Sequence, residues 1–145
     1  MTPYTVKLRN DERMIGVHPK LIAVVRAASD SVPILVTEGV RTLQRQKALY
    51  AQGRTKPGKM VTWTLNSKHR VQPDGFGHAV DLVPYRADGT IDWKDLASFD
   101  RMANAMFAAA AARKVEIRWG ADWDRDGNRR EQREHDSPHF ELFKA

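Results

Sequence analysis

Two histidines and one aspartate form the set of residues in this chain best suited to chemistry. His69 follows Ser67 by two positions, Asp81 lies in the apolar segment 79–83, and His139 lies near the end of the 145 residues. An isolated charge is costly to bury, so a carboxylate in an apolar segment needs a partner, and a metal ion is one such partner. Three nitrogen and oxygen ligands with one open position are typical of a catalytic zinc site. We therefore expect Zn²⁺ to be bound by His69, Asp81 and His139.

Two other histidines, His78 and His135, are alternative candidates for metal ligands. His78 precedes Asp81 by three positions, and side chains alternate between faces along a strand, so it should point away from Asp81. We expect His78 to be a partly exposed structural histidine. His135 stays open as an alternative to His139, because zinc accepts many loop geometries. Pro138 disfavours a helix here, which places His139 on a turn that leads into a strand.

Asp136 and Arg41 are the candidate catalytic groups around this metal. Asp136 precedes His139 by three positions, so it could accept a proton from zinc-activated water, whose pKa is lowered to about 7. Arg41 could stabilise an oxyanion or bind a substrate carboxylate through two hydrogen bonds. On spacing alone, Asp136 is more often a turn residue before proline, and for Arg41 a surface ion pair with Glu38 is as good an interpretation.

Composition limits the classes of partner and compartment. The net charge is +6 and the isoelectric point is near 9.8, which suits an anionic partner such as a cell-wall polymer, a membrane surface or a nucleic acid. Aromatic and basic residues do not interleave as in nucleic-acid modules, so we expect no nucleic acid as partner. The chain has no cysteine, which excludes thiolate ligands. No apolar run reaches the ~20 residues of a membrane span, and no signal peptide is evident.

The pattern of elements predicts an α+β fold in one domain, residues 1–145, with an antiparallel sheet flanked by helices. Apolar residues at helical spacing or in short β-branched runs define the expected elements. The expected helices are 19–28, 43–51 and 93–113, and the expected strands are 34–36, 61–65, 114–119 and 139–143. Residues 1–17 show little periodicity and are expected to form an arm or loop. The irregular order of helices and strands argues against a regular βαβ repeat.

A second cation site is suggested by Asp122, Asp124 and Asp126, which have the spacing of the first ligands of a calcium loop. The twelfth position of that loop is Arg133, where a bidentate glutamate is needed. Glu131 or Glu134 could substitute for it. An acidic turn balanced by neighbouring arginines is the favoured interpretation, and Ca²⁺ stays a secondary prediction.

The motifs resemble those of the VanY- and VanX-type zinc peptidases, and in particular of phage endolysins that act as L-alanyl-D-glutamate peptidases. The matching motifs are Ser-Lys-His at 67–69, Gly-His-Ala-Val-Asp at 77–81 and Asp-Ser-Pro-His at 136–139. The upstream segment 38–42 with Gln44 or Gln46 resembles the substrate-binding block of these enzymes. The aspartate at position 136 is similar to the endolysin branch. The stretch between His69 and Gly77 is longer than the usual spacing.

The resemblance implies a fold, an activity and a set of site residues. The fold would be like that of hedgehog and DD-peptidase domains, and the activity would be hydrolysis of peptidoglycan stem peptides, at the L-alanyl-D-glutamate bond. His69, Asp81 and His139 would bind zinc and Asp136 would be the base. Arg41, Ser67 and Gln44 would contact substrate.

Three further expectations accompany this function. The enzyme would be a monomer, made in the host cytoplasm and released to act on the wall. A D-alanyl-D-alanine carboxypeptidase is the alternative activity. A non-enzymatic binder of anionic polymer is the alternative of another class.

Overall fold

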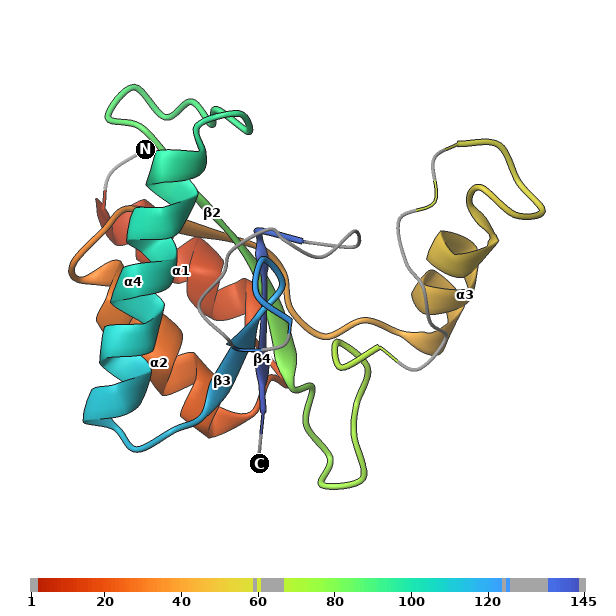
Figure 1. Cartoon of the computed structure of the whole chain (residues 1–145). Coiled ribbons are helices and arrows are strands. Elements are labelled where there is room, and N and C mark those ends of the chain that lie inside the picture. Colours follow the sequence, from red (N-terminus) through yellow and green to blue (C-terminus); the bar gives the residue numbers. More distant parts are fainter. Residues whose placement is uncertain (1–2, 59, 61–66, 124, 126–135, 144–145) are drawn as a thin grey trace.

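The computed structural model describes residues 3–58, 60, 67–123, 125 and 136–143 (Figure 1). Its elements in chain order are α1 (Pro3–Arg13), α2 (Pro19–Ser29), β1 (Ile34–Glu38), α3 (Leu43–Ala51), β2 (Ala79–Pro84), α4 (Leu96–Ala112), β3 (Ile117–Trp119) and β4 (His139–Leu142). No helix among these residues is long and apolar enough to cross a membrane.

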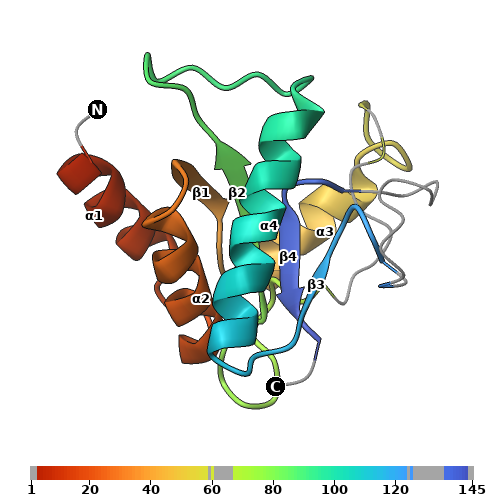
Figure 2. The ribbon, with the colours of Figure 1, turned by 60° about the vertical axis from the view of Figure 1, so that its left-hand side comes forward.

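The four strands form one sheet in the order β1-β2-β4-β3, and every neighbouring pair is antiparallel. Helices α1, α2 and α4 lie together on one side of this sheet, whereas α3 lies on the other side (Figures 1 and 2). The predicted α+β fold with an antiparallel sheet is therefore confirmed.

The two faces of the sheet differ in chemistry because side chains alternate along each strand. Val80 and Leu82 of β2, and Phe140 and Leu142 of β4, belong to the buried hydrophobic core together with residues of α1, α2 and α4. The side chains between them, including Asp81, therefore point to the opposite face. This alternation creates a polar face on the side of the sheet that the three core helices leave uncovered.

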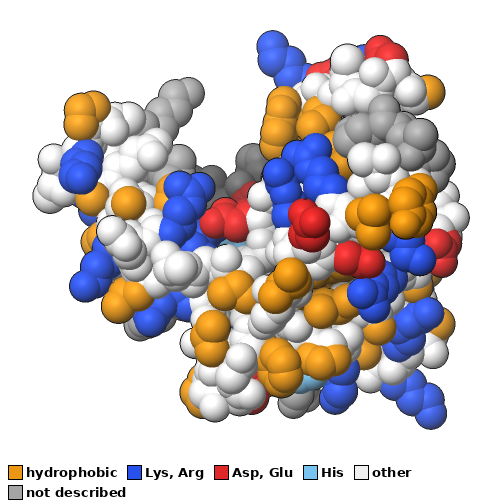
Figure 3. Space-filling model, turned by 180° about the vertical axis from the view of Figure 1, so that it is seen from behind, with side chains coloured by type: hydrophobic (Ala, Val, Ile, Leu, Met, Phe, Trp, Pro, Cys, Tyr) orange, Lys and Arg blue, Asp and Glu red, His pale blue; other side chains and the backbone are white. Residues whose placement is uncertain are grey.

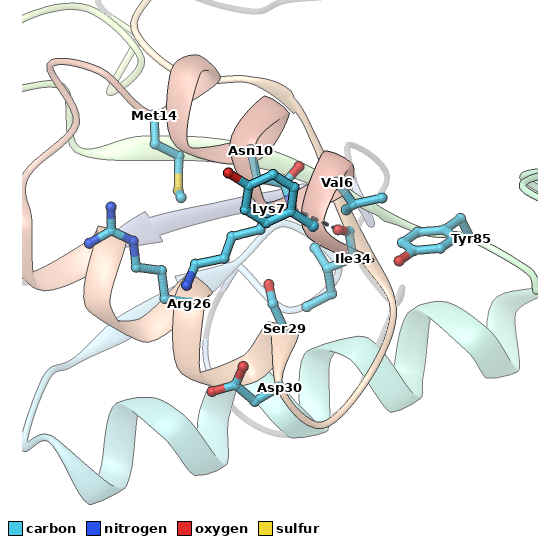
Figure 4. A pocket seen from close by; sticks show the side chains of 10 residues that line it. Val6, Lys7, Asn10, Met14, Arg26, Ser29, Asp30, Ile34 and Tyr85 are labelled. Carbon is cyan, nitrogen blue, oxygen red and sulfur yellow. Dashed lines mark hydrogen bonds between the residues drawn. The ribbon is translucent and has the colours of Figure 1, made fainter. Parts of the chain in front are cut away.

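The N-terminal segment is a helix, so the prediction of an arm over residues 1–17 was wrong. Helix α1 is fixed to β1 by Asn10, whose side chain donates to the Ile34 carbonyl at 2.9 Å (Figure 4). The same side chain accepts from the Val36 amide, also at 2.9 Å. Arg13 donates to the Val36 carbonyl at 3.2 Å. A cavity of about 370 Å³, lined in part by Tyr4 and Arg26, lies beside these contacts.

Helices α2 and α3 begin where their capping residues predict. The Thr42 hydroxyl accepts a hydrogen bond from the Arg45 amide and caps α3, and His18 caps α2 through its Nδ1. Helix α4 begins at Leu96, three residues later than expected, because Asp95 is its capping residue. The strand expected at 61–65 lies outside the described residues.

Candidate metal centre

His69, Asp81 and His139 converge, and their ligand atoms all lie within 4.8 Å of one another. Asp81 on β2 and His139 on β4 are direct partners across the two strands. The Asp81 Oδ1 atom lies 3.1 Å from His69 Nε2 and 3.4 Å from His139 Nδ1. The three residues therefore form a metal-binding group, and it is the one found among the residues that the structure describes.

His69 is positioned by the segment that links β1 to α3, although it comes from a different loop. Its Nδ1 donates a hydrogen bond to the Gly39 carbonyl at 2.8 Å, so Nε2 is the ring nitrogen that faces Asp81. Hydrogen bonds of this type fix the tautomer and orientation of metal-binding histidines. The His69 side chain is only 2% exposed, so few other orientations are open to it.

His139 is oriented in the opposite sense. Its Nε2 lies 2.8 Å from the Glu141 Oε1 atom, two residues along the same strand, and its Nδ1 faces Asp81. Residues two apart in a strand share a face, so β4 presents both side chains to the polar face of the sheet. The site therefore offers Nε2 of His69 and Nδ1 of His139 to a metal.

A β-bulge brings Arg41 to the same site. The register between β1 and β2 shifts between Val36 and Glu38, which places Glu38 opposite Asp81. Glu38 accepts two hydrogen bonds from Arg41, at 2.8 and 2.9 Å, and Arg41 donates a third to Gln46 at 2.8 Å. The guanidinium then lies with its Nη2 atom 3.8 Å from Asp81 Oδ2.

Both interpretations of Arg41 weighed from the sequence are therefore consistent with its position. It forms the ion pair with Glu38, and it also lies beside the metal-binding group. Three hydrogen bonds use three of the five N–H groups of a guanidinium, so two are not used by them.

The charges in the site are strongly coupled. Burial acts to raise the pKa of Asp81, but hydrogen bonds and the charges of His139 and His69 hold it well below its usual range. Burial acts to lower the pKa of His139, but Asp81 and Glu141 raise it to about 9. In the metal-free protein His139 is therefore a cation at neutral pH, and a metal ion has to displace a proton from it.

Asp136 lies in the turn that precedes β4, as its position before Pro138 predicts. Its amide donates to the Gly120 carbonyl at 2.6 Å, and its carbonyl accepts from the His139 amide at 3.1 Å. The residue reaches solvent, yet partial desolvation of its carboxyl and repulsion from Asp81 raise its pKa above the usual value. A raised pKa suits a group that accepts a proton near neutral pH.

Two residues predicted to contact substrate occupy positions that indicate other contacts. The buried Ser67 hydroxyl accepts a hydrogen bond from the His69 amide at 3.1 Å, so it supports the position of His69. Gln44 is exposed on α3, whereas Gln46 is buried and binds Arg41. Substrate contacts by Ser67 and Gln44 stay predictions.

The predicted calcium ligands and the two alternative histidines can be compared with the structure only in part. Asp122 is buried beside Trp119, whereas Asp124, Asp126 and the alternative ligand His135 lie outside the described residues. Nothing among the described residues supports the calcium prediction. His78 is 8% exposed and binds Asp74 at 2.7 Å, so it is more buried than expected.

Sequence reasoning missed Glu141, which contacts His139, whereas Glu38 was named only as an ion-pair partner of Arg41 and Gln46 only as an alternative to Gln44. The signal for Glu141 was present, because a glutamate two positions after His139 in a strand shares its face. Gln46 could not be separated from Gln44 by sequence, since the orientation of α3 depends on its contact with Arg41.

A hollow lies between the α3 lobe and the rest of the protein. Figure 3 shows it lined by acidic and basic side chains, with α3 on the left of that view. The metal-binding group faces the same side of the sheet as α3. Trp123 lies beside His139, with ring centroids 5.2 Å apart, and adds an aromatic wall.

The fold and the site together define an α+β metalloprotein with two imidazoles and one carboxylate on the polar face of a sheet. Such a donor set fits zinc, and the absence of cysteine rules out a thiolate alternative. Three protein ligands leave a position for water or substrate, which is the arrangement of catalytic rather than structural zinc sites.

The chain belongs to the phage L-alanyl-D-glutamate peptidase family, because the profile of that family matches residues 3–143. The resemblance stated from the motifs is therefore confirmed.

Two curated relatives are similar to the chain. The peptidoglycan L-alanyl-D-glutamate endopeptidase CwlK of Bacillus subtilis is 31% identical over 121 residues, which cover 81% of this chain and 65% of CwlK. The chain thus spans slightly less than two thirds of that protein. The L-alanyl-D-glutamate peptidase of Escherichia phage T5 is 30% identical over 140 residues, which cover 92% of this chain and 95% of the phage protein.

Solved structures agree with the fold. The crystal structure of the Serratia marcescens L-Ala D-Glu endopeptidase ChiX is 32% identical, with a TM-score of 0.71 over 92% of this chain and 86% of ChiX. The D,D-dipeptidase VanXYg, solved with a D-Ala-D-Ala phosphinate analogue, is 18% identical, with a TM-score of 0.52 over 87% of this chain and 50% of that chain. At this identity the likeness to VanXYg concerns the fold alone.

Proposed function

We propose that this protein is a zinc-dependent peptidoglycan peptidase that hydrolyses the L-alanyl-D-glutamate bond of stem peptides. The observation that carries the proposal is the convergence of His69, Asp81 and His139 beside Arg41 and Asp136. Membership of the L-alanyl-D-glutamate peptidase family supports the choice of bond. The names of CwlK, the phage T5 protein and ChiX support the same choice.

The metal would be held by His69 Nε2, Asp81 and His139 Nδ1. Bound zinc supplies Lewis acidity, which polarises a carbonyl and acidifies water. Asp136 accepts the proton of the attacking water and can pass it to the leaving amine, and the upward shift of its pKa makes its carboxylate a better proton acceptor than an ordinary aspartate.

Arg41 stabilises the negative charge that develops on the carbonyl oxygen. Its guanidinium is held rigid by Glu38 and Gln46, so little reorganisation is needed when the charge appears. The two N–H groups left over from those bonds are the donors that would meet the oxyanion or a substrate carboxylate. Glu38 thereby sets the direction of the guanidinium. The Arg41 side chain is only 9% exposed.

Digestion of purified peptidoglycan followed by mass spectrometry tests the bond and the metal requirement together. We expect new D-glutamyl amino termini and free L-alanyl carboxyl termini, no products after chelation, and recovery with zinc. Release of terminal D-alanine in their place would identify a carboxypeptidase. Binding to the wall without any product would identify a non-enzymatic binder.

Three further statements belong to the same proposal. The chain acts as one catalytic domain, and it acts as a monomer, which analytical ultracentrifugation at working concentration would test. It meets its substrate at the cell wall after release from the cytoplasm, which expression with and without a membrane-permeabilising protein would test.

A further inference from the structure

Four side chains of alternating charge cross three strands on the polar face of the sheet. Asp81 on β2 pairs with His139 on β4, and Glu141 on β4 pairs with Arg118 on β3. The order across the face is therefore carboxylate, imidazole, carboxylate and guanidinium. Asp81 and His139 belong to the metal-binding group, whereas Glu141 and Arg118 do not, so metal binding alone does not explain the position of these two residues.

Both oxygens of Glu141 are engaged by this row. The Oε1 atom lies 2.8 Å from His139 Nε2, and the Oε2 atom accepts a hydrogen bond from Arg118 Nη2 at 2.8 Å. The Glu141 side chain is 6% exposed, whereas that of Arg118 is 32% exposed. A carboxylate this buried is retained only with partners, and here one partner is a metal ligand and the other is a fixed cation.

We propose that Glu141 is a positioning residue for the metal ligand His139, and that Arg118 in turn holds Glu141 in place. A carboxylate that accepts the second N–H of a ligating histidine fixes the ring orientation and makes the other nitrogen a better donor. The geometry meets this requirement, because Nε2 of His139 faces Glu141 while Nδ1 faces Asp81.

The two histidines of the site are supported differently. His69 donates to a backbone carbonyl, which is neutral, whereas His139 faces a carboxylate. A charged acceptor polarises an imidazole more strongly than a neutral one. His139 is therefore the ligand whose donor strength depends on a side chain that mutation can remove. The inference rests on the proposed zinc-dependent function and adds two residues to it.

Zinc affinity measured by competition with a chromophoric chelator tests the role of Glu141 without depending on activity. We expect Glu141→Ala to weaken zinc binding about 10–100-fold. Glu141→Gln keeps an oxygen acceptor, so its zinc affinity should fall measurably less than that of Glu141→Ala. Arg118→Gln should weaken binding, and the double variant Arg118→Gln/Glu141→Ala should be little worse than Glu141→Ala, because both changes act through one contact. Glu116→Gln, on the exposed approach to β3, is the matched control and should bind as the wild type does.

The visible spectrum of the cobalt-substituted protein gives a second readout that a purely structural ion pair would not change. We expect the bands of Glu141→Ala to differ from those of the wild type and the bands of Glu141→Gln to lie nearer to it. Wild-type affinity in Glu141→Ala, with a lower melting temperature in chelator, would overturn the proposal. If Glu141→Ala does not fold, unchanged affinity in both Glu141→Gln and Arg118→Gln would overturn it.

These outcomes are separate from those of the proposed function. Zinc binding by the wild type without hydrolysis of peptidoglycan would overturn the peptidase proposal and leave the comparison of affinities valid. Hydrolysis by the wild type together with equal affinities in all variants would overturn the role of Glu141 alone.

Discussion

The Arg41 amide donates a hydrogen bond to the His69 carbonyl at 2.7 Å. Two residues earlier in the same segment, the Gly39 carbonyl accepts from the His69 ring. The segment between β1 and α3 therefore holds His69 at two points and carries the arginine that faces the metal-binding group. Movement of this segment would alter both parts of the site together.

Replacement of Arg41 by lysine should lower kcat about 100-fold, which is the typical cost of losing one oxyanion donor. Lysine cannot reproduce the planar fork that binds Glu38 and Gln46 together. Rates on purified peptidoglycan, with zinc content measured in parallel, check this expectation. Arg45→Lys is the matched control, since Arg45 is an exposed neighbour that also lies near Glu38. Equal losses in both variants would contradict a special role for Arg41.

Replacement of Asp136 by asparagine should lower kcat about 10²–10⁴-fold while zinc stays bound, because asparagine cannot accept a proton. Metal content measured by atomic emission and turnover measured on the same sample separate the two effects. Asp88→Asn, in an exposed turn, should leave turnover unchanged. Turnover near the wild-type rate in Asp136→Asn would disprove the assignment of the base.

The stability of the chelated protein should fall as the pH rises from about 6.5 to 9. Although burial opposes it, Asp81 and Glu141 raise the folded-state pKa of His139 to about 9, above the usual 6.5. The stabilising contribution of this cation is complete below the unfolded pKa and is lost as the pH passes the folded pKa. Zinc needs the deprotonated ring, so the stabilisation that zinc adds should grow over the same range.

Urea unfolding in chelator and in excess zinc, at several values of pH, measures both trends. His139→Gln removes the titrating group, so its chelated form should show a shallower dependence than the wild type. Identical slopes in the two chelated proteins would show that His139 is not the group responsible.

Salt should slow the digestion of intact peptidoglycan. The chain carries a formal charge of +6, and attraction to an anionic polymer weakens as the screening length falls from about 10 Å at 0.1 M to about 3 Å at 1 M salt. A short soluble stem peptide should be cleaved at a rate that depends less on salt. A rate on whole wall that stays constant over this range would exclude charge as the means of attachment.

Replacement of Asn10 by alanine should lower the free energy of unfolding by about 2 kcal/mol or more, because it leaves a buried carbonyl and a buried amide of β1 without a partner. Urea denaturation measures the change. Glu12→Ala, on an exposed position of the same helix, should change stability little. Stability equal to the wild type would show that α1 is fixed by other contacts.

Local signals predicted those parts of the fold that depend on local physics. Thr42 and the pair His18-Pro19 mark helix starts, and the two faces of β2 follow from alternation, so α2, α3 and the direction of Asp81 were predictable. The N-terminal helix was not, because its buried stripe is interrupted by Asn10. Asn10 can be buried only because β1 provides its hydrogen-bond partners, and this tertiary contact cannot be read from the local sequence.

In the site, too, some features follow from local sequence and others depend on tertiary contacts. The residue types and motifs predicted His69, Asp81 and His139, which the fold brings together. The supporting contacts depend on geometry that no spacing encodes. The bulge that sets Glu38 opposite Asp81 and the loop that buries His78 against Asp74 are two examples.

Gly39 touches two parts of the protein that are remote in sequence. Its carbonyl binds the His69 ring, and a Cβ at this position would collide with the Arg13 carbonyl at the end of α1. The first helix therefore abuts the backbone that orients His69, a member of the metal-binding group. Any side chain larger than hydrogen at position 39 would therefore push the end of α1 away from the segment that orients His69.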